Sequence, residues 1–161
     1  MRKRSKYTPK GASPSAWVIA MQGSCLLSEY DQSIRIDPVR EAVSAISKGT
    51  ANKQNWTVIF DTFNLFEEFS RMPKIMQGAN DYVHSFQNVI MGILDRQKAT
   101  GTKALYPAEL DALTGFCELW EGVIRSVTHR EYFVAEERTA RRLNQLIRQK
   151  KGGVRIVEVP A

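Results

Sequence analysis

Apolar residues recur three and four positions apart along most of the chain, which is the spacing of one face of a helix. An aromatic-rich stripe runs through residues 53–72: Trp56, Ile59, Phe60, Phe63, Phe66 and Phe69. A second runs through residues 74–98: Met76, Ala79, Val83, Phe86, Ile90, Ile93 and Leu94. A third runs through residues 107–127: Leu113, Phe116, Cys117, Trp120, Val123 and Ile124. The pattern therefore predicts helices over these three segments.

Two capping signals predict further helices nearer the N-terminus. In Ser13-Pro14 and Asp37-Pro38 a capping side chain precedes a proline, whose fixed φ suits the first helical position. Gly49 then supplies a typical helix stop for the second of them. The helices expected from these signals are Pro14–Leu27 and Asp37–Lys48.

A last helix is predicted to begin at Thr128 and to run to about Lys151. Thr128 and Glu131 have the spacing of a capping box, in which hydroxyl and carboxylate each bond the other's backbone N–H. A continuous helix through Thr128 is the alternative. Four apolar residues share an arc of ~80° on this helix: Phe133, Ala140, Leu143 and Ile147. We expect this arc to pack on the other helices and the opposite side to be basic.

These segments predict an all-α fold, a single-domain bundle of five to six helices joined by short connections. The bundle is expected to span residues 14–151. Residues 1–13 are basic and rich in Gly, Pro and Ser, which predicts a flexible arm, and residues 152–161 follow two glycines and predict an extended tail. No apolar run approaches the ~18–20 residues of a membrane span, so we expect a cytoplasmic protein.

The net charge of +6 is distributed unevenly along the 161 residues. Residues 1–10 carry five basic residues and no acidic one, and residues 138–161 carry seven basic residues and one acidic one. Residues 11–137 carry 11 basic and 16 acidic residues. An acidic body therefore lies between two basic ends, and binding of a polyanion is expected at those ends only.

Two clusters of basic residues are candidate sites for nucleic acid or another anion. One is in the N-terminal arm: Arg2, Lys3, Arg4, Lys6 and Lys10. The other shares an arc of ~120° on the last helix: Arg138, Arg141, Arg142 and Arg148. Cationic arms bind phosphate backbones with little sequence specificity, and guanidinium groups match phosphate geometry. A solvated, solubilising surface is the alternative for both clusters.

No arrangement of residues typical of an enzyme occurs in the sequence. There is no phosphate-binding glycine loop, no Gly-x-Ser-x-Gly and no HExxH. His84 and His129 are expected to be structural or surface side chains. Cys25 and Cys117 lie among apolar residues and are expected to be buried, reduced thiols. We therefore expect a non-enzymatic protein with no catalytic residue, no metal ligand and no cofactor.

Three stretches of the chain resemble an uncharacterised family of short helical proteins encoded by phages, prophages and plasmids of proteobacteria. The stretches are MRKRSKYTPKG, WTVIFDTFNLFEEF and YPAELDALTGFCELWEGVIRSVTHREYFVAEERTARRL. The resemblance covers most of residues 1–11, 56–69 and 105–143. It implies a mobile-element context and a bacterial host cytoplasm, and it carries over no catalytic or binding residue.

The expected function is therefore binding. The leading expectation is a phage or prophage accessory protein that binds a host protein or complex, for example as an inhibitor of a host defence or regulatory system. The first alternative is a sequence-tolerant DNA- or RNA-binding protein that uses the arm and the last helix. The second is a virion-associated protein. The helices over 53–72 and 107–127 are apolar over wide arcs, which leaves two alternatives for those faces: a homo-oligomer interface or the core of the bundle.

Overall fold

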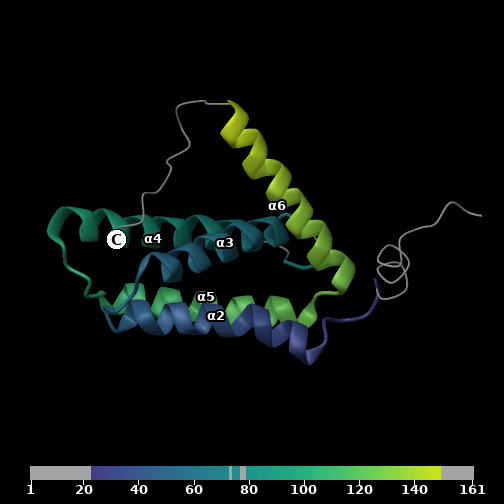
Figure 1. Cartoon of the computed structure of the whole chain (residues 1–161), viewed down its shortest axis with the longest axis horizontal. Helices are drawn as coiled ribbons and strands as arrows, with labels where there is room; N and C mark the ends of the chain where they lie inside the picture. Colours follow the sequence, from purple (N-terminus) through teal and green to yellow (C-terminus); the bar gives the residue numbers. More distant parts are fainter. Residues whose placement is uncertain (1–22, 73, 77–78, 150–161) are drawn as a thin grey trace, which may run out of the picture.

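The structure is a computed structural model in which residues 23–72, 74–76 and 79–149 are described. They form five helices, labelled as in Figure 1: α2 (Glu29–Ser47), α3 (Lys53–Ser70), α4 (Asn80–Thr100), α5 (Pro107–Ser126) and α6 (His129–Gln149). The predicted all-α bundle is confirmed. The predicted arm, the predicted extended tail and most of the predicted first helix lie outside the described residues. None of the described helices combines the length and apolarity needed to cross a membrane.

Helix α3 is the element that most of the bundle packs on. It contacts α2, α4 and α6, while α5 contacts α2 and α4. Figure 1 shows α2 and α5 side by side in one layer, α3 and α4 in the other, and α6 crossing obliquely at one end. The aromatic stripe of α3 lies between the layers, where Phe66 and Phe69 have no exposed surface. Burying a side chain of this size stabilises the fold by ~1.5–3 kcal/mol.

The core of the bundle is aromatic. The ring of Phe116 on α5 stacks on that of Phe86 on α4, with centroids 4.2 Å apart, and meets that of Phe66 edge-on at 5.3 Å. Offset-stacked and edge-to-face pairs are the preferred geometries of aromatic rings. The stripes predicted over 53–72 and 107–127 are therefore core, and the bounds of α3 and α5 agree closely with the prediction.

The predicted start of α2 at Asp37 is wrong, because the helix begins at Glu29. Ser28 is its N-cap, and the hydroxyl of Ser28 accepts a hydrogen bond of 3.1 Å from the backbone N–H of Asp31. This cap has the same chemistry as the one assigned to Asp37. Residues 23–27 form turns and an isolated bridge, so the helix predicted over Pro14–Leu27 does not reach Leu27.

Pro38 therefore lies inside α2 rather than at its first turn. It has no N–H to donate to the carbonyl of Ile34, a loss that usually ends or kinks a helix. The helix continues because its inner face is buried on both sides of the proline: Ile36, Val39, Ala42, Val43 and Ile46. Burial of that face outweighs the local cost of the proline.

Helix α4 begins at Asn80 instead of Lys74, so its predicted start is also wrong. The backbone N–H groups of Ile75 and Met76 donate to the carbonyl of Met72 at 2.9 and 3.3 Å, which makes a turn. Ile75 and Met76 pack against the core from this turn. Met76 thus contacts the core from the turn before α4, although its apolar spacing had placed it in the helix.

The last helix is connected to α5 as predicted. The backbone N–H of Thr128 donates to Glu131 Oε2 at 2.9 Å, and the N–H of Glu131 donates to Thr128 Oγ1 at 3.3 Å. This reciprocal pair is the capping box. Val127 has extended backbone angles between the two helices, which excludes a continuous helix through Thr128. Thr128 also forms an antiparallel bridge with Leu26.

The side of α6 that packs on the bundle differs from the predicted one. Tyr132, Ala135 and Thr139 are buried, whereas Phe133 is 49% exposed and Ile147 is 71% exposed. The prediction took the most apolar arc of the helix as the packed one. The packed arc is rotated from it by roughly a quarter-turn. Within the predicted arc, Leu143 is partly buried, whereas Phe133 and Ile147 stay exposed.

Candidate functional site: a groove beside α6

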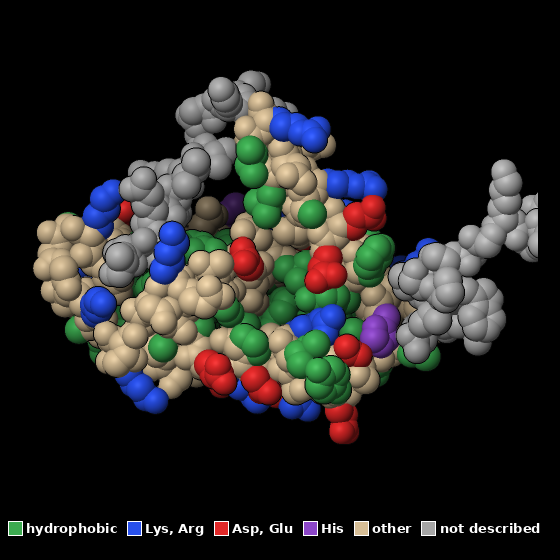
Figure 2. All heavy atoms as spheres, viewed as in Figure 1, with side chains coloured by type: hydrophobic (Ala, Val, Ile, Leu, Met, Phe, Trp, Pro, Cys, Tyr) green, Lys and Arg blue, Asp and Glu red, His purple; other side chains and the backbone are tan. Residues whose placement is uncertain are grey.

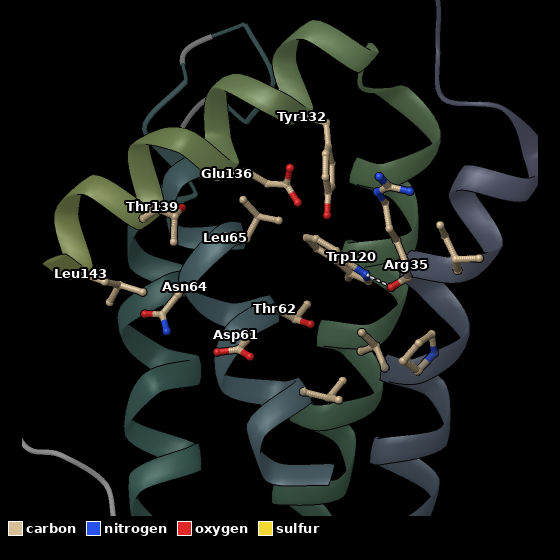
Figure 3. A pocket seen from close by; sticks show the side chains of 15 residues that line it. Arg35, Asp61, Thr62, Asn64, Leu65, Trp120, Tyr132, Glu136, Thr139 and Leu143 are labelled. Atoms are coloured by element: carbon tan, nitrogen blue, oxygen red, sulfur yellow. Dashed lines mark hydrogen bonds between the residues drawn. The ribbon is translucent and has the colours of Figure 1, made fainter. Parts of the chain in front are cut away.

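A groove of about 500 Å³ runs between α6 on one side and α2 and α3 on the other (Figure 3). The apolar side chains that line it are Ile34, Pro38 and Val39 of α2, Val58 and Leu65 of α3, Trp120 of α5, and Ala140 and Leu143 of α6. Figure 2 shows apolar side chains gathered in the hollow between α6 and α2, with acidic side chains beside them. Its volume lies in the ~300–1,000 Å³ range of ligand pockets.

Hydrogen bonding fixes the floor of the groove. Trp120 of α5 points between α2 and α3, and its indole N–H donates a hydrogen bond of 2.9 Å to the carbonyl of Arg35 (Figure 3). The Arg35 guanidinium lies 4.3 Å from the centroid of the Tyr132 ring on α6. Arg35 also donates to the carbonyl of Asp31 at 2.7 Å. These contacts between α2, α5 and α6 therefore fix the floor of the groove and its end at Tyr132.

Ion pairs attach α6 to α3 along the other edge of the groove. The Arg142 guanidinium pairs with the Glu67 carboxylate and donates to the carbonyl of Asn64 at 3.1 Å. Arg138 lies 3.8 Å from the carboxylate of Glu68, which is 7% exposed. A buried carboxylate needs such a partner, because desolvation of an unpaired charge is costly. These contacts set the oblique path of α6.

Two carboxylates give the groove an acidic rim. Asp61 lies on α3 and Glu136 on α6, and both line the groove (Figure 3). Burial raises the pKa of Asp61 above its ordinary value of 3.8. Burial also raises the pKa of Tyr132, with the nearby Glu136 carboxylate adding to the shift and Arg35 opposing it. The two carboxylates would therefore attract a cationic group into the groove. That group would offset the free-energy cost of burying the ionised Asp61 carboxylate.

The lining of the groove combines apolar side chains with a few charged ones. Among the described residues, its lining contains no His and no Cys. No cluster of three or more His, Cys, Asp or Glu able to hold a metal ion occurs in the described segments. An apolar lining with a few charged groups at the rim is typical of a surface that takes an amphipathic segment.

The histidines and cysteines lie apart from the groove. His84 is exposed on α4, and His129 lies 3.9 Å from the Asp31 carboxylate at the start of α6. The prediction of a buried Cys25 is wrong, because its side chain is exposed in the turn before α2. Cys117 is half-buried, and burial raises the pKa of its thiol. Apolar neighbours in sequence did not predict burial for Cys25, because it lies in a surface turn.

The structure describes the four arginines predicted on the last helix but none of the predicted arm residues. Arg142 faces the bundle in its pair with Glu67, and Arg138 approaches Glu68. Arg141 pairs with Glu137 one turn away. Arg148 is exposed and makes no ion pair within the described chain. Arg2, Lys3, Arg4, Lys6 and Lys10 lie outside the described residues.

Sequence reasoning did not single out the groove residues. Val58 and Leu65 lie beside the aromatic stripe of α3 in the sequence. Their position at the groove depends on the angle at which α6 crosses α3, and no local pattern encodes that angle. The one available signal was the breadth of the α3 stripe, which predicts burial from two sides.

Comparison of the chain with protein-family models, with curated proteins and with solved structures found no match. The comparisons therefore add nothing to the resemblance to the phage, prophage and plasmid family, which stays a prediction.

Proposed function

We propose that this protein acts by binding another protein, without catalysis, and that the groove beside α6 is its binding surface. The supporting observation is an apolar groove with an acidic rim, bordered by an amphipathic helix whose Ala140 and Leu143 line the groove. Such a surface takes an extended or helical segment that carries apolar side chains and at least one cation. The resemblance to proteins of mobile elements makes a host protein or complex the proposed source of that segment.

Shape and charge both support a protein segment as the occupant. Apolar lining contributes ~25 cal/mol for each Å² removed from water, and the open side of the groove admits a chain. Asp61 and Glu136 lie on opposite walls, so a cationic side chain at the rim meets a carboxylate from either side. Binding of this kind fits interference with a host complex.

Nucleic-acid binding is the second candidate, and it rests on the exposed side chains of Arg141 and Arg148. Arg138 and Arg142 are engaged by carboxylates of α3, which lowers the density of free cations on this helix. This candidate predicts binding that weakens steeply with salt.

Affinity purification from lysate of a bacterial host tests the proposal. The tagged full chain is compared with Val58→Asp, which puts a charge on the groove wall, and with Leu119→Asp on the exposed side of α5. We expect one stoichiometric protein partner that survives nuclease treatment, is retained by Leu119→Asp and is lost with Val58→Asp. A partner retained equally by both variants, or recovery of nucleic acid alone, would overturn the proposal. Circular dichroism confirms that both variants keep their helix content.

A further inference from the structure

The charge of the helical body is not spread evenly over its surface. Residues 42–60 and 96–108 together contain five basic residues and no acidic one, although residues 11–137 are acidic as a whole. These two stretches contain the α2–α3 and α4–α5 connections, and the Cβ position of Gly49 lies 3.7 Å from the Cβ of Lys103. Figure 1 shows both connections at the end of the bundle away from the start of α6, and Figure 2 shows basic side chains there.

Three lysines come together where these connections meet. Lys48 and Lys53 flank the α2–α3 connection, and Lys103 lies in the α4–α5 connection. All three side chains are exposed, and none makes an ion pair within the described chain. The next acidic residue, Glu109, is engaged by Arg96, whose Nη2 lies 2.6 Å from Oε2. The charge of the three lysines is therefore not neutralised by a neighbouring carboxylate among the described residues.

Acidic residues mark the limits of this basic surface. Asp95 lies one turn before Lys98 on α4, so Lys98 is left out of the surface, and Asp111 lies in the second turn of α5. On α2 and α3 the nearest acidic residues are Glu41 and Asp61, about two helical turns from the nearest lysine. The positive charge is therefore local to the two connections.

An exposed aromatic ring lies beside the lysines. Tyr106 is the N-cap residue of α5, three positions after Lys103, and it is 61% exposed. The Arg96 guanidinium lies 4.2 Å from the centroid of its ring. Arg96 is itself held by the Glu109 carboxylate and by the carbonyl of Ala104, to which it donates at 2.9 Å. The ring is therefore held in position while more than half of the residue stays open to solvent.

We propose that Lys48, Lys53, Lys103 and Tyr106, which we call the loop patch, bind single-stranded nucleic acid. The ammonium groups contact phosphates and the tyrosine ring stacks on a base, which is the combination that single-strand-binding surfaces use. A duplex engages the lysines only, because its bases are already stacked on one another. An acidic protein segment also leaves the ring of Tyr106 without a base to stack on.

The loop patch adds a site that is separate from the groove and from Arg141 and Arg148. Three lysines neutralise about three phosphates, so the logarithm of the binding constant should fall with the logarithm of salt concentration at a slope of ~−2. The sequence predicted polyanion binding at the chain ends only, because charge was counted along the chain. The structure brings together two basic stretches that are distant in the sequence. The protein then holds a target in its groove and a single strand at the loop patch.

Fluorescence anisotropy with a labelled oligothymidylate of about 12 nucleotides tests the site in the full chain. The wild-type chain should bind this single strand more tightly than a duplex of the same length. The double variant Lys48→Gln, Lys103→Gln should bind about tenfold more weakly at low salt and show a slope reduced by ~1.4. The double variant Lys74→Gln, Arg130→Gln removes the same charge from exposed positions outside the patch and should bind as the wild type does.

Two replacements of Tyr106 separate stacking from charge. Tyr106→Phe keeps the ring and should bind as the wild type does. Tyr106→Leu should weaken binding about fivefold or more and leave the salt slope unchanged, because it removes the stacking surface and no phosphate contact. Circular dichroism checks that all variants keep their helix content.

The proposal is overturned if the wild-type chain binds no single strand at low salt or binds the duplex equally well. Equal losses of affinity in the two double variants, or wild-type affinity in Tyr106→Leu, also overturn it. Binding that Lys48→Gln, Lys103→Gln leaves unchanged assigns the nucleic acid to another part of the chain and has the same consequence. The proposed function is tested separately, because this double variant keeps Val58 and the groove, and its capture of a host protein is measured after nuclease treatment.

Discussion

The indole nitrogen of Trp120 donates a hydrogen bond of 2.9 Å to the backbone carbonyl of Arg35, a residue 85 positions earlier in the chain. The bond joins α5 to α2 at the floor of the groove, three residues before Pro38. Trp120 is 2% exposed, so its N–H has little access to water. This buried donor is therefore one of the contacts that fix the geometry of the groove.

Replacement of Trp120 by Phe removes this donor and part of the ring. We expect Trp120→Phe to lower the free energy of unfolding by ~2–4 kcal/mol, because lost packing adds to a lost hydrogen bond. Urea denaturation measures the change. Trp56→Phe is the control, since Trp56 is equally buried and its indole nitrogen makes no hydrogen bond within the described chain. A loss of stability in Trp120→Phe no larger than in Trp56→Phe would show that the bond to Arg35 contributes nothing.

The pair of Arg142 and Glu67 holds α6 on α3. Both side chains are less than a third exposed, and Arg142 also donates to the carbonyl of Asn64. A double-mutant cycle with alanine at both positions is expected to give a coupling energy of ~1 kcal/mol. The exposed pair of Glu137 and Arg141 should give only a few tenths of a kcal/mol, ~0.3, by the same method. Equal coupling energies for the two pairs would contradict a structural role for Arg142.

Asp61 is expected to make stability depend on pH. Its pKa in the folded protein is raised above 3.8 by burial, so folding favours the protonated carboxyl. The resulting stabilisation is fully present below the unfolded-state pKa and is lost as pH rises through the folded-state pKa. Asp61→Asn should therefore raise the unfolding free energy at neutral pH and leave it unchanged in acid.

Urea denaturation across the acidic range checks this, with Asp111→Asn on the exposed side of α5 as control. If Asp61→Asn had no effect at neutral pH, or the same effect at every pH, the carboxylate would not be strained by burial.

The two thiols are expected to react at different rates. Cys25 is exposed, whereas Cys117 is half-buried and its pKa is raised by burial, which lowers the fraction of reactive thiolate. In single-cysteine variants, Cys117→Ser should be labelled by a disulfide reagent about tenfold faster than Cys25→Ser. Absorbance of the released thiol follows both reactions. Faster labelling of Cys117 would mean that α5 opens readily toward solvent.

The elements that the sequence predicted well are those whose signals are local. The aromatic stripe of α3, the start of α5 at Pro107 and the capping box at Thr128 all depend on residues within a few positions of one another. The start of α2 was predicted wrongly because both Ser28 and Asp37 can act as N-caps. Burial of the helix face favours the start at Ser28, and that burial depends on tertiary contacts.

The groove was not predictable from the sequence for a related reason. Its walls come from α2, α3 and α6, and α6 is held there by its buried Tyr132, Ala135 and Thr139 and by the pairs of Arg142 and Arg138 with Glu67 and Glu68. Sequence periodicity identified the apolar arc of α6 correctly. It assigned that arc to the bundle because an apolar arc is usually the packed one, whereas here it borders the groove.

Photocrosslinking from the groove tests the central claim most directly. A photoreactive amino acid is placed at Val58 on the groove wall or at Leu119 on the far side of α5, and cells that produce the full chain are irradiated. We predict a covalent adduct with a host protein from position 58 and none from position 119, and the mass of the adduct identifies that protein. Absence of an adduct at position 58, or equal adducts at both positions, would contradict the assignment of the groove as the binding surface.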